Sequence, residues 1–168
     1  MGQTYSRVIL KSGKEQSLQR FHPWIFSGAI KEIKGMVEEG DVVEVVSNQG
    51  DFLAMGHVQP GSIAVRVFSF EQVAPDYAFW KGKLEKAVDV RAKLGLLDNP
   101  ETNVFRLVHG EGDGLPGLII DFYNGTAVMQ AHSAGMFLIR EMLAKALKEV
   151  MGDRLTAVYD KSEKTVPF

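Results

Sequence analysis

The first 70 residues place short apolar runs between turn residues, in the pattern of a small β domain. Residues 7–11 alternate charged and apolar positions and end at a Ser-Gly pair, which is typical of a strand followed by a turn. Three runs rich in β-branched and aromatic residues follow at 42–46, 52–58 and 63–68. Short strands at such close spacing predict a small barrel.

The stretch between the first and second of these strands has no strand periodicity. Residues 17–28 are interrupted by Pro23, so they predict a short helical turn and a packed loop. The favoured interpretation of Trp24, Ile25 and Phe26 is a plug of the barrel core. A second interpretation stays open, in which His22 and Trp24, beside Arg20, present an aromatic face and a cation to an unstacked RNA base.

Helical spacing begins after the first β pattern. Asp76 is in the position of an N-cap, and apolar residues then recur at helical intervals from 80 to 94. Asp89 and Lys93 add a favourable pair four residues apart. This helix either links two domains or packs on one of them.

The last third of the chain predicts strands, a helix and a final strand. Strands are expected at 105–109, 118–123 and 126–132, and Asn124–Gly125 is a strong hairpin turn. Apolar positions between 136 and 150 predict a helix that ends at Gly152. A strand at 155–160 follows, and residues 161–168 predict no further element.

Composition removes several classes of chemistry. The chain has 168 residues, 45% of them hydrophobic, and no cysteine. This length allows one domain or two small ones, and the missing cysteines exclude disulfides, thiolate metal sites and a cysteine nucleophile. Four scattered histidines argue against a zinc site. No apolar run approaches the ~20 residues that cross a bilayer and no secretory signal is visible, so we expect a soluble cytoplasmic protein without metal.

Charge is unevenly distributed along the chain, although its net value is only −2. Residues 1–34 carry two acidic side chains and six basic ones, namely Arg7, Lys11, Lys14, Arg20, Lys31 and Lys34. Residues 35–76 carry one basic side chain, Arg66, and seven acidic ones. Such segregation indicates one positive face suited to phosphate; the alternative is ordinary solvated surface.

A glycine cluster at 110–114, Gly-Glu-Gly-Asp-Gly, follows an apolar run. Loops of this kind hold S-adenosylmethionine (SAM) or a dinucleotide when a helix begins directly after them. Here a strand pattern follows instead, so the cluster predicts a tight acidic turn between paired strands and no cofactor site. A small hydrolase using His109, Glu111 and Asp113 is an alternative that requires these groups to converge in a pocket.

Two sets of residues resemble one known family. Residues 10–18 (LKSGKEQSL), 22–26 (HPWIF), 40–41 (GD) and 61–66 (GSIAVR) resemble the PUA domain of SAM-dependent large-subunit rRNA cytosine-carbon-5 methyltransferases. Residues 105–121 (FRLVHGEGDGLPGLIID) resemble the central domain of the same family. Members are considerably longer and carry a Rossmann-like domain with the SAM loop and a catalytic cysteine. The resemblance therefore implies an N-terminal fragment, inactive by itself, with no catalytic or cofactor residue of its own.

The expected fold class is α+β. We expect a PUA-like RNA-binding β-barrel at 1–72, a linking helix at 73–100 and a central β-β-α-β layer at 101–168. The resemblance implies that the fragment positions ribosomal RNA, its partner, for a catalytic domain that uses SAM. A homodimer and a protein-interaction module without nucleic-acid binding stay open as alternatives. The expected RNA-binding residues are Arg7, Lys11, Lys14, Arg20, His22, Trp24 and Arg66.

Overall fold

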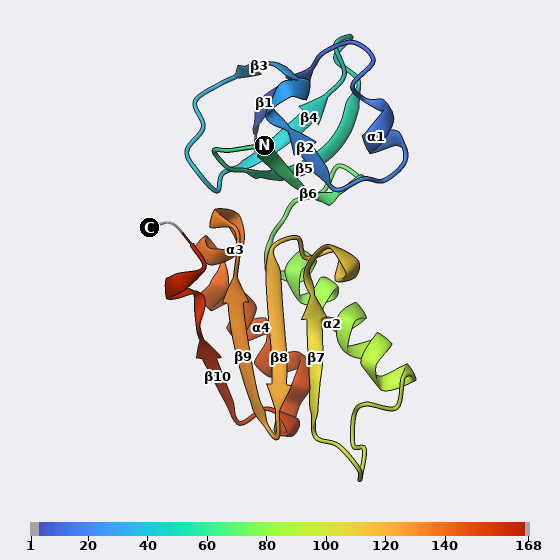
Figure 1. The fold of residues 1–168 in the computed structure, drawn as a ribbon, viewed down its shortest axis with the longest axis vertical. Coiled ribbons are helices and arrows are strands. Elements are labelled where there is room, and N and C mark those ends of the chain that lie inside the picture. Colours follow the sequence, from blue (N-terminus) through green and yellow to red (C-terminus); the bar gives the residue numbers. More distant parts are fainter. Residues whose placement is uncertain (1–3, 167–168) are drawn as a thin grey trace. The chain divides into compact units, whose positions relative to one another are not determined.

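The computed structural model describes residues 4–166 and divides into two compact units, Met1–Ala74 and Pro75–Phe168. Each unit has its own β-sheet and its own helices (Figure 1). The α+β fold class expected from the sequence is confirmed.

A curled six-stranded sheet forms the first unit. Its strand order is β2-β6-β5-β4-β1-β3, and β1 and β4 are parallel while the other pairs are antiparallel. The strands are β1 (Ser6–Leu10), β2 (Trp24–Phe26), β3 (Ile30–Lys34), β4 (Val42–Val46), β5 (Phe52–Val58) and β6 (Ile63–Ser69), with a short helix α1 (Gln16–Gln19) between β1 and β2.

The chain itself requires this sheet to curl. Strands β2 and β3 lie at opposite ends of the strand order, yet only the 3₁₀ turn η1 (Ser27–Ala29) separates them. The four Cα steps from Phe26 to Ile30 span at most ~14 Å. The two outer strands must therefore approach each other, and the sheet forms a half-barrel (Figure 1). Its concave face holds a core of aliphatic side chains, among them Val8, Val43, Val45 and Val65, none of which is exposed.

The sequence predicted four of these strands and missed two. The helical turn expected within residues 17–28 is present as α1. The expectation that the rest of that stretch is a loop is wrong, because β2 begins directly after Pro23 and pairs with β6. Proline is compatible with this place because it precedes a strand that has a partner on one side only. Strand β3 escaped prediction because three of its five residues are charged.

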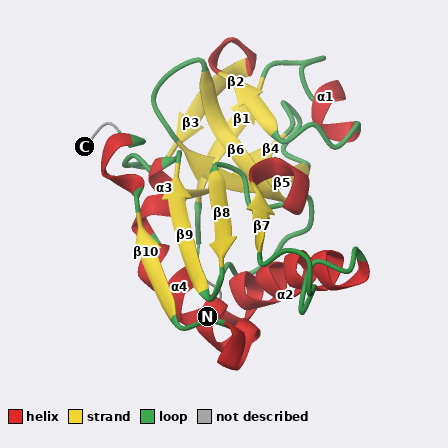
Figure 2. Cartoon of the chain, turned by 60° about the horizontal axis from the view of Figure 1, so that its bottom comes forward, coloured by secondary structure: helices red, strands yellow, loops and turns green. Residues whose placement is uncertain are grey.

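The second unit is a four-stranded sheet with helices on one face (Figure 2). The strand order is β10-β9-β8-β7, and only β10 runs parallel to its neighbour. The strands are β7 (Val104–His109), β8 (Leu118–Tyr123), β9 (Thr126–Ala131) and β10 (Ala157–Asp160), and the helices are α2 (Tyr77–Lys93), α3 (Ala134–Leu138) and α4 (Arg140–Met151). Alternate residues of β8, namely Leu118, Ile120 and Phe122, are buried.

The predicted helix signals are largely confirmed. Asp76 caps α2 by accepting a hydrogen bond from the Phe79 backbone N–H at 2.9 Å, and Lys93 contacts Asp89 at 2.6 Å. Helix α2 packs on α4 and β7, within the second unit. The single helix expected from 136 to 150 is instead divided at Ile139, where the backbone leaves helical geometry.

The expectation that no element follows residue 160 is also wrong. The 3₁₀ turn η4 (Ser162–Lys164) follows β10, while another 3₁₀ turn, η3 (Gly152–Arg154), precedes it. The Ser162 hydroxyl in η4 accepts a hydrogen bond from the Ala131 backbone N–H at 2.9 Å and is itself buried. Polar residues therefore end the sheet here by bonding to the last residue of β9, which a hydrophobic pattern does not reveal.

Candidate nucleic-acid interface

Strand β2 turns two aromatic side chains to the outer face of the half-barrel. Trp24 and Phe26 are two residues apart and share a face of the strand, whereas Ile25 between them points into the core and is 3% exposed. The Phe26 side chain is 49% exposed. The sequence interpretation of all three as a core plug is thus correct for Ile25 and wrong for Phe26.

His22 extends this aromatic surface at the start of β2. Its ring lies edge-on to Trp24 with centroids 5.9 Å apart, and Trp24 lies edge-on to Phe26 at 6.5 Å. The Trp24 backbone N–H lies 3.2 Å from His22 Nδ1 and donates to it, which fixes the imidazole relative to the strand. Together, His22, Trp24 and Phe26 form what we call the aromatic strip.

Cationic side chains flank the aromatic strip. Arg66 on β6 is directly opposite Trp24 in the register, and its guanidinium carbon lies 5.8 Å from the centre of the Trp24 ring. This geometry is a cation–π contact. Arg20 follows α1 and is exposed. Lys11 donates from Nζ to the Gly28 carbonyl at 2.9 Å, two residues beyond the strip.

The structure separates one predicted residue from this group. Arg7 lies on β1, whose neighbours are β3 and β4, and its Nε is 3.1 Å from the Glu44 carboxylate. Its charge is therefore partly compensated within the protein. Lys14 is exposed and lies in the same turn as Lys11, where its backbone N–H donates to the Lys11 carbonyl. Contact of any of these residues with RNA stays a prediction.

Phe21 is a candidate that the sequence reasoning missed. Its side chain is 72% exposed, and its backbone adopts φ +60°, a conformation that costs a non-glycine residue about 1–2 kcal/mol. Backbone bonds from Phe21 to Leu18 and from His22 to Ser17 hold it there, and its ring lies edge-on to Phe70. The sequence signal that indicates Phe21 is the high density of aromatic residues between 21 and 26.

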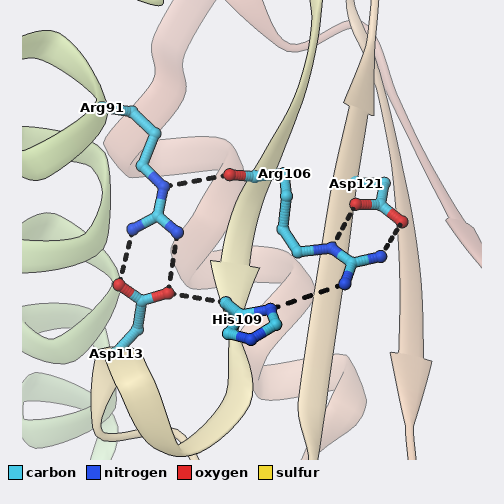
Figure 3. A network of polar contacts seen from close by, with 5 residues as sticks. All are labelled: Arg91, Arg106, His109, Asp113 and Asp121. Carbon is cyan, nitrogen blue, oxygen red and sulfur yellow. Dashed lines mark hydrogen bonds and ion pairs between the residues drawn. The ribbon is translucent and has the colours of Figure 1, made fainter. Parts of the chain in front are cut away.

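The second unit contains a network of ionic contacts around the glycine-rich turn (Figure 3). Arg91 of α2 is 8% exposed and binds both carboxylate oxygens of Asp113, at 2.5 and 2.9 Å. Asp113 also accepts from the His109 backbone N–H at 2.6 Å. On the neighbouring strands, Arg106 binds both oxygens of Asp121, and this contact raises the pKa of the Arg106 guanidinium.

This network argues against the hydrolase alternative. Both oxygens of Asp113 are engaged by Arg91 and a backbone amide, so the carboxylate is committed to holding the turn and is not available as a general base. The His109 ring is exposed and lies 3.5 Å from Arg106. A cation beside the imidazole does not provide the orienting carboxylate of a nucleophilic triad.

The glycine-rich turn does not fit SAM. Residues Gly110–Asp113 form the 3₁₀ turn η2, Gly114 adopts φ +67°, and the chain then enters β8. In a loop that holds SAM or a dinucleotide, the helix that follows directs its N-terminus at the ligand. Here strand β8 follows the turn, and no helix does. The turn therefore connects β7 and β8, as the sequence predicted.

Within residues 4–166, no group of three or more histidine and carboxylate side chains could hold a metal ion. No described helix has both the length and the apolar character needed to span a membrane.

Comparison with known families decides the nature of the first unit, because residues 8–70 match the family described as PUA-like domain. Residues 8–70 are a PUA-like domain. The aromatic strip and Arg66 all lie within this PUA-like domain, as do Lys11 and Arg20.

Nearly the whole chain is homologous to ribosomal RNA large subunit methyltransferase I. It is 39% identical to the Salmonella arizonae protein of that name over 164 residues, which are 96% of this chain and 40% of the relative. The Alteromonas mediterranea protein of the same name is 39% identical over 160 residues, 94% of this chain and 39% of the relative. The chain therefore spans about two-fifths of the length of these relatives.

Solved structures share the fold of the PUA-like domain and the second unit. A Streptococcus mutans protein assigned as a SAM-dependent methyltransferase superposes with a TM-score of 0.77 and 18% identity, over 92% of this chain and 40% of that one. SMU.776, assigned as a methyltransferase and solved with SAH, gives the same TM-score and identity over 91% of this chain and 40% of its own. At this identity the likeness concerns the fold alone.

Proposed function

We propose that the PUA-like domain binds RNA through the aromatic strip and the cations beside it. The observation that carries this proposal is the placement of Trp24 and Phe26 on the outer face of β2, with Arg66 against the Trp24 ring. Aromatic rings stack with unpaired bases whatever their sequence, and arginine and lysine contact phosphates. Lys11, Lys14 and Arg20 supply such cations close to the strip.

The homologues suggest which RNA is bound. Relatives named ribosomal RNA large subunit methyltransferase I make ribosomal RNA the proposed partner, and a cytoplasmic location follows from that partner. We further propose that residues 1–72 bind the RNA and that residues 73–100 connect them to the central domain at 101–168, on which helix α2 packs through α4 and β7. In this proposal methyl transfer from SAM to carbon 5 of a cytosine is performed by residues outside this sequence, which contains no cysteine and whose glycine-rich turn does not fit SAM.

The decisive experiment measures binding of the 168-residue chain to fluorescent large-subunit rRNA fragments over a range of salt concentrations. Trp24→Ala removes a stacking surface and should weaken binding by about 1–3 kcal/mol, while Trp24→Phe should restore most of it. Arg66→Ala and Arg20→Ala should each reduce the slope of log Kd against log salt by about one.

Arg7→Ala is the matched control, because it removes an arginine of the same domain that is already paired with Glu44. We expect it to change the affinity and the salt slope least. The proposal is rejected if binding is independent of salt, or if the double variant Lys11→Glu and Arg20→Glu binds as well as the unchanged chain.

A further inference from the structure

A groove opens in the first unit beside the outer strand β3. It measures about 430 Å³ and lies between β3 and the β5–β6 turn. Aliphatic and small side chains make up most of its lining, including Ile30, Ile33, Val37, Val58, Pro60 and Ala64. The groove is separate from the aromatic strip, none of whose three residues lines it.

Ile33 is an apolar side chain of this groove that no other described strand covers. In the register between β1 and β3, Ile33 is directly opposite Val8, which belongs to the core and is 0% exposed. Paired residues share a face of the sheet, so Ile33 also faces the core side, yet it is 39% exposed. Among the described strands β3 pairs with β1 alone, so no further strand covers this side chain.

The free edge of β3 is a second property of the same place. An outer strand presents N–H and C=O groups that can pair with an added strand. Met36 precedes the lining residue Val37 and is 94% exposed, and methionine is a flexible apolar side chain of the kind found at adaptable binding surfaces. An added strand could thus bond to β3 through its backbone while its alternate side chains enter the groove.

Negative charge at the rim selects the occupant. Glu38 and Glu39 both line the groove, and the Glu38 backbone N–H donates to the Asp41 carboxylate at 2.8 Å, which adds a third carboxylate to this loop. The lysines of β3 do not line the groove, since Lys34 lies 3.9 Å from Glu32 and Lys31 donates to Asn48.

These carboxylates disfavour two other occupants. They repel the phosphates of RNA, and an isologous contact between two copies of β3 would place two such loops at one interface. They attract a segment that carries lysine or arginine. We propose that the groove binds an extended, basic segment of another protein, which adds a strand to β3, places aliphatic side chains against Ile33 and directs its cations to Glu38 and Glu39.

The test uses the 168-residue chain and a synthetic peptide as the probe. The peptide Lys-Lys-Val-Thr-Ile-Thr-Val-Lys-Lys, blocked at both ends, is titrated into ¹⁵N-labelled protein, and amide shifts are followed by NMR. We expect the shifts to concentrate in residues 30–39 and 58–64. A peptide with glutamate in place of lysine should bind at least about tenfold more weakly because of the rim charge. N-methylation of alternate residues of the probe should abolish binding by removing its backbone donors.

Protein variants separate the two parts of the proposal. Ile33→Asp places a charge in the apolar groove and should abolish peptide binding while RNA binding stays unchanged. Glu38→Gln with Glu39→Gln should weaken peptide binding about fivefold, the effect of two exposed ion pairs, and this surface change preserves the fold. Glu71→Gln, an exposed carboxylate outside the groove, is the matched control and should have no effect.

Three results would overturn the proposal. Peptide-induced shifts confined to the aromatic strip would assign the binding to the RNA surface. Equal binding of the lysine and glutamate peptides would remove the role of the rim charges. Self-association of the chain in sedimentation that Ile33→Asp abolishes would make a second copy the occupant.

Discussion

His57 is a histidine that the folded protein keeps uncharged. It lies on β5 with 3% of its surface exposed, and its ring packs on Phe68 with centroids 4.9 Å apart. Burial disfavours the imidazolium form because a charged ring loses its hydration, and it lowers the pKa of His57 to about 4. In the unfolded chain the same ring has its ordinary pKa near 6.5.

This difference predicts a loss of stability in acid. Below pH 6.5 the unfolded state binds a proton that the folded state does not, so the free energy of unfolding falls as the pH decreases and levels off below pH 4. The full contribution is about 3 kcal/mol. Urea unfolding between pH 7 and pH 4 should show this loss in the unchanged chain and a smaller loss in His57→Gln, whose carboxylates still titrate. Equal losses in both proteins would show that His57 does not carry the effect.

At the scale of single elements, the strand that carries the candidate site shows where sequence reasoning reaches its limit. Trp24, Ile25 and Phe26 have similar apolar character, and hydrophobicity alone places all three in a core. Only the pairing of β2 with β6 decides that Ile25 faces inward and that its two neighbours face outward. Three residues are too few to show a period of two, and Pro23 hides the start of the strand. Cap and turn signals are local, and for that reason Asp76 and Asn124–Gly125 were predicted correctly.

The contact between α2 and the glycine-rich turn depends on the pair of Arg91 and Asp113, whose side chains are 10% and 9% exposed. Asp113→Ala leaves the Arg91 guanidinium buried without its carboxylate, and we expect a loss of about 3–5 kcal/mol in the free energy of unfolding. Replacing both residues, as Arg91→Met with Asp113→Leu, removes the buried charge and should recover much of that loss. Urea unfolding followed by circular dichroism measures all three proteins.

Asp89→Ala is the control for this pair on the same helix. Asp89 and Lys93 form an exposed ion pair, with side chains 56% and 75% exposed, and such a pair contributes about 0.3–0.5 kcal/mol. A loss for Asp113→Ala no larger than that for Asp89→Ala would contradict the structural role assigned to the buried pair.

At the scale of the whole molecule, the α+β class and most strands followed from patterns in the sequence, whereas the curl of the first sheet did not. The half-barrel depends on β2 and β3, which the hydrophobic pattern does not mark, and on the parallel pairing of β1 with β4 across 31 residues of intervening chain. The groove beside β3 is a consequence of that topology. Ile33 faces the core side but stays exposed because β3 is the last strand in the order. The residue type of Ile33 does not reveal this.

Two units with separate cores should respond separately to damage in either core. The chain has two tryptophans, Trp24 in the first unit and Trp80 in the second, so labelling with 5-fluorotryptophan gives one ¹⁹F NMR signal for each unit. Leu10 and Leu84 are buried in different units, and truncation of either to alanine should cost about 2–5 kcal/mol. Because each cavity lies in one core only, Leu10→Ala should lower the urea midpoint of the Trp24 signal, and Leu84→Ala should lower that of Trp80. If either variant shifts both signals equally, the two units unfold as one cooperative body, and RNA binding by the first unit must then be tested in the intact chain alone.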